Sequence, residues 1–369
     1  MQDKIYFYCA PSGIPDSKET VYQHVIVSLA EGLKALGIPF YSNRDFWKTD
    51  IEDDKYLLKC DPKVTPDDCS VVVMHTAWFT YGLPMPEGLF HPHRHYTTVY
   101  FESEADAKHA WRPEFKLFDF IFRCHFNTRF KYPKNFYPWA FGLSNRILRE
   151  LVEIPSFAER NRSLLVNFRI HHPIRTCIQE NLLPQLQSIL PIDNSVDATQ
   201  SPPSDPYDFL QWTQTDRRHY PRYYERLRFS SACACFGGLL INPWPLDAFG
   251  PSKLWDRAIN KIITLVDSRP RRIMNWESWR FWEAMAAGSV VLHVDLEKYG
   301  AALPEMPQNW RHYIGVDLEN LQDTVDRIEG DPDLLEKISS AGRDWAIQHY
   351  SPIPTAQRFL STLNMNRDE

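Results

Sequence analysis

The 369-residue sequence lacks the features that mark several classes of protein. It has no long run of lysine and arginine, and its formal net charge is −6, which argues against a general nucleic-acid-binding protein. The apolar run that follows Met1-Gln2-Asp3-Lys4 is too short for a signal peptide or a membrane span. We therefore expect a cytoplasmic protein with no transmembrane segment and no nucleic-acid partner.

Metal-binding motifs are also missing. The seven cysteines are odd in number, scattered, and without a Cys-x-x-Cys pair, which argues against a zinc site or a redox motif and fits a reducing compartment. Two adjacent histidines, His171 and His172, rarely point at one ion, and we interpret the alternating histidines at 91, 93 and 95 as part of a solvated loop. We expect no bound metal and no cofactor.

What the sequence does contain is a recurring strand–helix pattern. Hydrophobic residues make up 43% of the chain, enough for two cores, and the length favours two domains. An apolar strand is predicted at 5–9, an amphipathic helix at 20–36 ended by Gly37, and a strand at 38–41. This order is a βαβ unit, and further apolar runs at 70–74, 97–101 and 120–124 extend its parallel sheet.

Polar side chains follow these strands at the edge where parallel α/β sheets bind ligands. His75, Glu102 and His125 come directly after three of the predicted strands. Any one of them could serve as the base that deprotonates an acceptor hydroxyl. Each could instead be structural, as a helix-capping carboxylate or a hydrogen-bonded histidine.

A second α/β unit is predicted from 163 onward. The expected elements are strands at 164–168, 232–236 and 289–294, and helices at 175–190, 220–229, 253–265, 276–287, 317–329, 331–349 and 355–363. We interpret 193–208, rich in Pro, Ser and Asp, as a surface excursion, and the basic residues between Arg217 and Arg228 as a solvated helix face. The predicted division is a first domain at 1–159, a second at 160–350, and a C-terminal helix at 351–369 that crosses back to the first.

The passage from Ser278 to Gly288 has the chemistry of a nucleotide site. Ser278 is a good N-cap, and the N–H groups of a helix N-terminus suit a diphosphate. Arg280 in the first turn could add a bidentate contact, and Glu283, one turn on, could accept hydrogen bonds from two ribose hydroxyls. The same two residues could equally form an exposed ion pair of little energetic value.

These residues resemble a known donor-site signature. The sequence supplies Ser278, Arg280, Trp282, Glu283, Ala284 and Gly288, followed by Val290-Val291, in the register of exostosin-like and "glycosyl transferase group 1" enzymes. The upstream segment 224–230 resembles the exostosin lead-in to a strand and a glycine. The resemblance implies the GT-B fold, in which two Rossmann-like domains face each other across a cleft. Two departures are that Glu277 and Glu283 are six apart rather than eight, and that about forty residues separate Gly237 from Ser278.

The resemblance also implies roles. Arg169 and Arg175, after the strand that opens the second domain, are similar to a cationic pair that neutralises the leaving diphosphate, and we add Glu277 and Gly237 to the expected nucleotide-sugar contacts. No Asp-x-Asp motif appears in a loop of the first half, as expected for metal-free donor binding. The implied activity is sugar transfer from a nucleotide donor, such as a UDP-sugar, to a glycan, lipid-linked or small-molecule acceptor. A nucleotide-sugar epimerase and a non-catalytic binding protein of the same fold are the alternatives.

Overall fold

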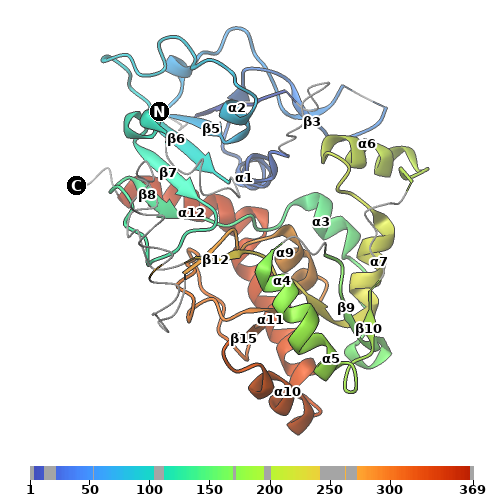
Figure 1. Ribbon diagram of the computed structural model, residues 1–369. Helices are drawn as coiled ribbons and strands as arrows, with labels where there is room; N and C mark the ends of the chain where they lie inside the picture. The colour runs from blue at the N-terminus through green and yellow to red at the C-terminus, as the bar shows by residue number, and fades with distance from the viewer. Residues whose placement is uncertain are drawn as a thin grey trace.

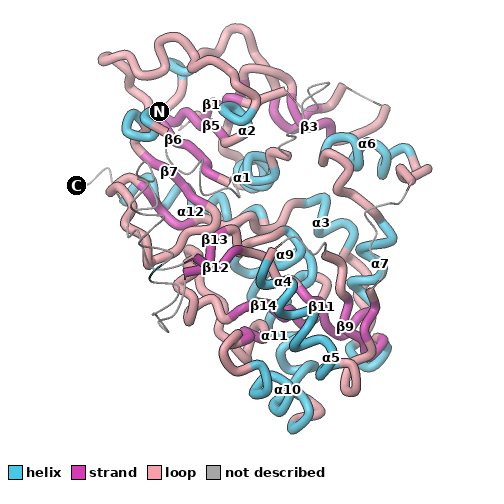
Figure 2. The backbone as a smooth tube through the Cα atoms, viewed as in Figure 1, coloured by secondary structure: helices cyan, strands magenta, loops and turns pink. Residues whose placement is uncertain are grey.

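A computed structural model describes residues 4–11, 22–52, 54–103, 112–168, 172–194, 201–241, 262 and 272–365. In these ranges the chain forms two separate parallel sheets with helices around them (Figures 1 and 2). None of the helices in the described ranges has both the length and the apolar character needed to cross a bilayer.

The first sheet is parallel throughout, with the strand order β2-β1-β5-β6-β7-β8. Its strands are β1 (Ile5–Tyr8), β2 (Phe40–Ser42), β5 (Val71–His75), β6 (Thr97–Glu102), β7 (Phe120–Arg123) and β8 (Phe136–Pro138). A small antiparallel hairpin, β3 (Phe46–Lys48) with β4 (Tyr56–Leu58), lies beside it, and α2 (Ala77–Thr80) follows β5. The expected strands at 5–9, 38–41, 70–74, 97–101 and 120–124 are thus present within one or two residues.

Alternate residues of the first sheet enter two different cores, as the two-residue period of a strand requires. Ile5 and Phe7 pack on the side of α1 (His24–Ala35), whereas Tyr6 faces the opposite side. The C-terminal helix α12 (Pro352–Met365) packs against α1 in the same core, so the end of the chain lies against the first sheet (Figure 1). We keep 1–159, 160–350 and 351–369 as the proposed division of the chain.

The second sheet has the parallel order β10-β9-β11-β14-β15. Its strands are β9 (Asn161–Leu165), β10 (Ile192–Asp193), β11 (Ser230–Ala234), β14 (Val290–Val294) and β15 (Ile314–Val316), with an antiparallel pair β12 (Leu239–Ile241) and β13 (Arg272–Met274) nearby. The surrounding helices are α3 (Asn145–Glu150), α4 (Pro173–Cys177), α5 (Leu183–Leu186), α6 (Pro206–Gln214), α7 (Pro221–Phe229), α9 (Trp279–Ala286), α10 (Leu321–Gly330) and α11 (Leu334–Tyr350).

Two predicted segments differ in the structure. The excursion expected at 193–208 ends in a helix, α6, because Asp205 accepts hydrogen bonds from the N–H groups of Tyr207 and Asp208 while Pro206 occupies the first turn. The helix expected at 175–190 contains a π-helical turn at Ile178–Leu182, just before Pro184, which has no N–H for a regular helix to use. The helix expected at 253–265 lies outside the described residues, apart from position 262.

Gly32 allows α1 and α12 to approach closely, since a Cβ there would lie 2.0 Å from the carbonyl oxygen of Pro352. Gly32→Ala should therefore lower the free energy of unfolding by about 1–3 kcal/mol through overpacking, even though alanine favours the helix by about 1 kcal/mol. Chemical denaturation measures the change. Gly330→Ala is the matched control, because its added methyl would meet nothing within 4 Å. Equal stability of the two variants would contradict this account of the helix pair.

Candidate functional site

Two arginines, Arg175 and Arg280, lie at the carboxyl edge of the second sheet, near enough for their charges to interact. Arg175 lies in α4, its Nε donates to the carbonyl oxygen of Phe236 at 2.8 Å, and its guanidinium carbon lies 5.3 Å from the ring centre of Phe168. Burial and the nearby positive charge of Arg280 lower the pKa of Arg175 to about 10. Gly237 follows Phe236, and a Cβ at this glycine would lie 2.9 Å from the carbonyl oxygen of Trp276. The strand β11 therefore ends within reach of the segment that leads into α9.

The first turn of α9 contains several buried polar atoms without a hydrogen-bond partner among the described residues. Ser278 occupies the N-cap with extended backbone angles, but its Oγ makes no capping bond. Trp279 Nε1 and Arg280 Nη1 are unpartnered as well, and so are Glu277 Oε2 and Asn275 Oδ1 just before the helix. An unsatisfied buried polar group costs about 1–3 kcal/mol, so such a concentration is typical of a site that awaits a polar ligand.

His125 brings the first sheet to this segment. It follows β7 with a left-handed backbone (φ 58°), and its Nδ1 accepts a hydrogen bond from the backbone N–H of Glu277 at 3.1 Å. The neutral ring then carries its hydrogen on Nε2, which is buried without a partner in the described ranges. Burial, together with the charge of Arg123, lowers the pKa of His125 to about 3.

Glu277 lies between the two sheets. Its Oε1 accepts hydrogen bonds from Trp282 Nε1 at 2.7 Å and from the backbone N–H of Phe141 at 2.5 Å. Burial raises the pKa of Glu277 to about 8, against the lowering effect of these hydrogen bonds. The carboxyl is therefore held rigidly by one oxygen, while the other, Oε2, is the unpartnered atom.

His75 and Glu102 form a separate cluster at the ends of β5 and β6. His75 Nδ1 accepts from the N–H of Ala77 at 3.1 Å, and its Nε2 lies 2.9 Å from Ser103 Oγ. Glu102 Oε1 accepts from Thr76 Oγ1 at 3.3 Å. Arg123, opposite Glu102 in the register of β6 and β7, lies 3.9 Å from the same oxygen. The strand ends thus bring two of the three candidate bases together, and the third lies with Glu277.

Glu283 is buried rather than exposed, which rules out the exposed ion pair considered from the sequence. Its Oε1 accepts a hydrogen bond from Tyr224 Oη at 2.7 Å, and Arg146 Nη2 lies 4.0 Å from the same oxygen. Burial raises the pKa of Glu283, while Arg146 and the tyrosine hydrogen bond act in the opposite direction. Arg146 was not predicted from the sequence, because no motif or periodicity singles it out.

The basic residues from Arg217 to Arg228, which span the turn before α7 and most of α7 itself, do not form a fully solvated face. His219 is completely buried, and Arg226 forms an ion pair of 2.7 Å with Asp193. The prediction of a solvated helix face is therefore wrong for these two residues, because α7 packs against α3 and β9 and the His219 ring is enclosed by Arg146 and Asp208. Arg169, the partner predicted for Arg175, lies outside the described residues.

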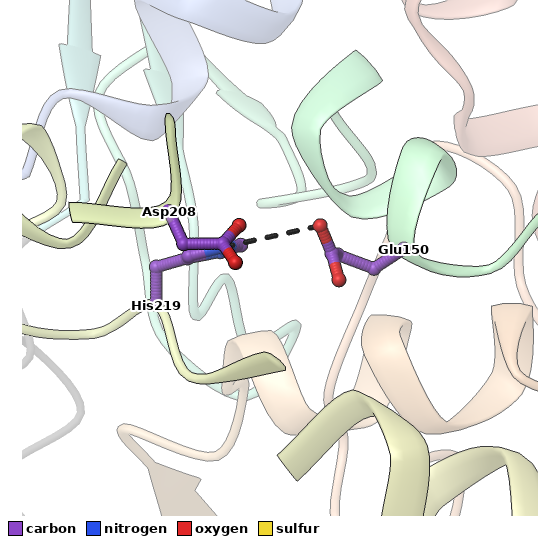
Figure 3. A group of neighbouring side chains, drawn as sticks. All are labelled: Glu150, Asp208 and His219. Atoms are coloured by element: carbon purple, nitrogen blue, oxygen red, sulfur yellow. Dashed lines mark hydrogen bonds and ion pairs between the residues drawn. The ribbon is translucent and has the colours of Figure 1, made fainter. Parts of the chain in front are cut away.

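His219, Glu150 and Asp208 place one ligand atom each within 4.8 Å of one another, a spacing that could suit a metal ion (Figure 3). Arg146 Nη1 lies 3.0 Å from His219 Nδ1, and arginine can only donate, so this nitrogen accepts and Nε2 carries the hydrogen. Nε2 then donates to Asp208 Oδ1 at 3.2 Å. A ring with both nitrogens engaged in this way does not fit a metal ligand.

Neither a model of a known protein family nor a curated protein sequence matches the chain. Solved structures do resemble it. Sucrose-phosphate synthase from Thermosynechococcus elongatus is 11% identical over 99% of both chains (TM-score 0.46), and AviGT4, a glycosyltransferase involved in avilamycin A biosynthesis, is 13% identical over 97% of this chain and 96% of its own (TM-score 0.45). An α-glucosyltransferase in complex with UDP-glucose and DNA containing an abasic site is 10% identical over 98% of both chains, with a TM-score of 0.51. With this enzyme the chain shares the fold of two Rossmann-like domains known as GT-B.

Proposed function

We propose that the chain is a glycosyltransferase that moves a sugar from a nucleoside-diphosphate donor to an acceptor hydroxyl. The observation that carries the proposal is the cluster of polar atoms at the start of α9 that have no partner among the described residues, near the two cations Arg175 and Arg280. A diphosphate would meet N–H donors at this helix end and the positive charges of Arg175 and Arg280. These charges would replace the divalent ion that other diphosphate sites use, so donor binding is proposed to be metal-independent.

The nucleotide would extend along α9. In this arrangement Ser278 and the backbone at Gly237 contact the diphosphate, and Glu283 accepts hydrogen bonds from the ribose. Arg169 is proposed as the second cation beside Arg175. The in-register signature at Ser278–Gly288 supports an exostosin-like or group 1 type of donor site.

The transferred sugar would lie between Glu277 and His125, whose Oε2 and Nε2 have no hydrogen-bond partner within the part of the chain that the structure describes. His125 Nε2 carries a hydrogen in this tautomer, so its fitting role is to donate to a sugar hydroxyl rather than to act as a base. His75 Nδ1 is likewise occupied by the N–H of Ala77. Glu102 is the remaining candidate for contact with the acceptor hydroxyl.

The acceptor would approach from the first sheet, as a glycan, a lipid-linked sugar or a small molecule. Nucleic acid is not among the proposed acceptors, because the net charge is −6 and no basic run is present. All seven cysteines are free thiols, which supports a cytoplasmic location.

A thermal-shift screen of UDP, GDP, ADP, TDP and CMP tests the proposal. One nucleoside diphosphate at about 100 times its Kd should raise the melting temperature by about 2–5 °C, and the shift should persist in EDTA. A shift that EDTA abolishes would overturn metal-independent binding, and no shift with any nucleotide would overturn the donor site. Product analysis with the selected UDP-, GDP-, ADP- or TDP-sugar then separates the functions. A transferase releases the diphosphate in response to an acceptor, an epimerase converts the sugar without one, and a binding protein does neither.

A further inference from the structure

Arg146 is the centre of a buried polar network beneath α9. Its Nη1 donates to Tyr224 Oη at 2.7 Å and lies 3.0 Å from His219 Nδ1, while its Nη2 lies 4.0 Å from Glu283 Oε1. Tyr224 in turn donates to the same carboxylate oxygen at 2.7 Å. Three elements, α3, α7 and α9, therefore meet at one guanidinium group, which is itself only 5% exposed.

The turn between α6 and α7 delivers His219 to this network. Asp216 and Arg217 both have left-handed backbones, with φ of 56° and 61°, a conformation that side-chain-bearing residues keep only when their surroundings hold it. His219 comes two residues after Arg217 and is fully buried. Asp208 Oδ1 accepts a hydrogen bond from His219 Nε2, and Glu150 Oε1 lies 3.9 Å from the same nitrogen (Figure 3).

The two carboxylates fix the histidine ring, and the ring fixes the arginine. Since the Nε2 hydrogen points to Asp208, the Nδ1 lone pair is directed at Arg146 and holds one end of its guanidinium group. Tyr224 holds the same end from α7. The guanidinium group is thereby left with its other nitrogen directed at the Glu283 carboxylate.

We propose that Arg146 is a positioning residue for donor binding, which keeps the Glu283 carboxylate ionised and oriented so that it can accept hydrogen bonds from both ribose hydroxyls. The inference rests on the proposed function, because the ribose is the ligand that Glu283 would recognise. Arg146 itself does not touch the nucleotide. Without its charge, the buried carboxylate would bind a proton and lose the capacity to accept two hydrogen bonds.

The charged and titratable groups that face Glu283 come from four elements. Arg146 belongs to α3, Tyr223 and Tyr224 to α7, Arg280 to α9 itself, and Cys235 follows β11. Arg146 and Arg280 favour the ionised carboxylate, as does the hydrogen bond from Tyr224, and Arg146 has the largest effect of the three. In Arg146→Met the loss of nucleotide affinity on acidification should therefore begin at a higher pH than in the wild type.

The test compares UDP with 2′,3′-dideoxy-UDP by isothermal titration calorimetry on the full chain. The wild type should prefer UDP by about 10- to 100-fold, because hydrogen bonds to a buried carboxylate are lost with the two hydroxyls. Arg146→Met and Glu283→Ala should each reduce this preference to about onefold, and the double variant should reduce it no further. Affinity for the dideoxy compound should change by less than about threefold, since its diphosphate contacts remain.

Arg149→Met is the matched control, because Arg149 lies on α3 as well but is exposed and packs on the ring of Tyr207. It should keep the preference for UDP. If Arg146→Met does not fold, Tyr224→Phe takes its place in the test. It removes the hydroxyl that contacts both Arg146 and Glu283, and the preference for UDP over the dideoxy compound should fall between those of the wild type and Glu283→Ala.

Each further outcome has one meaning. A wild type that binds neither compound, nor any other nucleotide of the thermal-shift screen, overturns the proposed function, and this inference with it. If the screen selects another nucleoside diphosphate, that nucleotide and its 2′,3′-dideoxy form replace the UDP pair. A wild type that binds both equally overturns the ribose contact of Glu283. A preference that survives in Arg146→Met, or affinities for both compounds that fall in parallel, overturns the positioning role alone.

Discussion

Arg175→Met is expected to lower kcat by about 100-fold, in the range found when a preorganised group that stabilises developing charge is removed. Departure of a nucleoside diphosphate creates negative charge on its terminal phosphate. In the proposed site Arg175 would lie beside that position. It is held by Phe236 and Phe168, near the like charge of Arg280. Two cations fixed in a water-poor environment repel each other until an anion arrives, so their arrangement favours the state with the most negative charge.

The binding of donor and of product should respond to Arg175→Met to different extents. The free diphosphate carries more charge than the intact nucleotide sugar, so Arg175→Met should weaken product inhibition by the diphosphate more than it raises the donor KM. Steady-state kinetics with a donor series and inhibition by the matching diphosphate measure both. Arg175→Lys, which keeps the charge but loses the planar fork, should recover part of kcat. Arg327→Met, at an exposed pair on α10, is the control for the loss of an arginine. A rise in donor KM with kcat unchanged would show that Arg175 contributes binding only.

The position of Arg175 and Arg280 could be predicted because it depends on local signals. Arg175 lies in α4, after the strand β9, and Arg280 lies in the first turn of α9, the helix that leads back into β14, so both are at the carboxyl edge of one parallel sheet. The glycine after α9, Gly288, has the left-handed φ of 66° that ends a helix. The start of α6 has a local signal too, the N-cap Asp205 followed by Pro206. The prediction missed it because the whole segment 193–208 is rich in Pro, Ser and Asp, which is typical of a loop. Local sequence therefore specifies the element ends at which the proposed site lies.

The surroundings of Glu283 could not be predicted in this way. Tyr224 is 59 residues away from Glu283 in the chain, and Arg146 is 78 residues away from Tyr224. Which buried polar groups meet depends on how α3, α7 and α9 pack, and no period or motif encodes that choice. The same holds for His125, whose contact with Glu277 spans 152 residues and joins the two sheets.

Glu277→Gln should lower kcat by about 100- to 1000-fold, the effect of removing one group that stabilises charge in the transition state. Cleavage of a glycosidic bond develops positive charge on the sugar ring, which an ionised carboxylate stabilises and a carboxamide does not. With a pKa of about 8, Glu277 is mostly protonated at neutral pH. The wild-type kcat should therefore rise from pH 6 to 9, and this rise should be absent in Glu277→Gln. Glu336→Gln, at an exposed site on α11, should keep it.

The free energy of unfolding of the wild type should fall with rising pH, in contrast to kcat, which should rise. Burial raises the pKa of Glu277 from its ordinary 4.5 to about 8, so the folded state binds this proton more tightly than the unfolded state does. The contribution is fully favourable below pH 4.5 and is lost as the pH rises through 8. Glutamine keeps the hydrogen bonds from Trp282 and Phe141 but does not ionise, so Glu277→Gln should gain stability relative to the wild type across that window. Denaturation at pH 5 and pH 8 measures the difference. Suppose that Glu277→Gln lowers kcat and becomes more stable than the wild type as the pH rises. Ionisation of the Glu277 carboxyl would then favour catalysis and destabilise the fold. A constant stability difference would place the raised pKa, and with it the pH dependence of kcat, elsewhere.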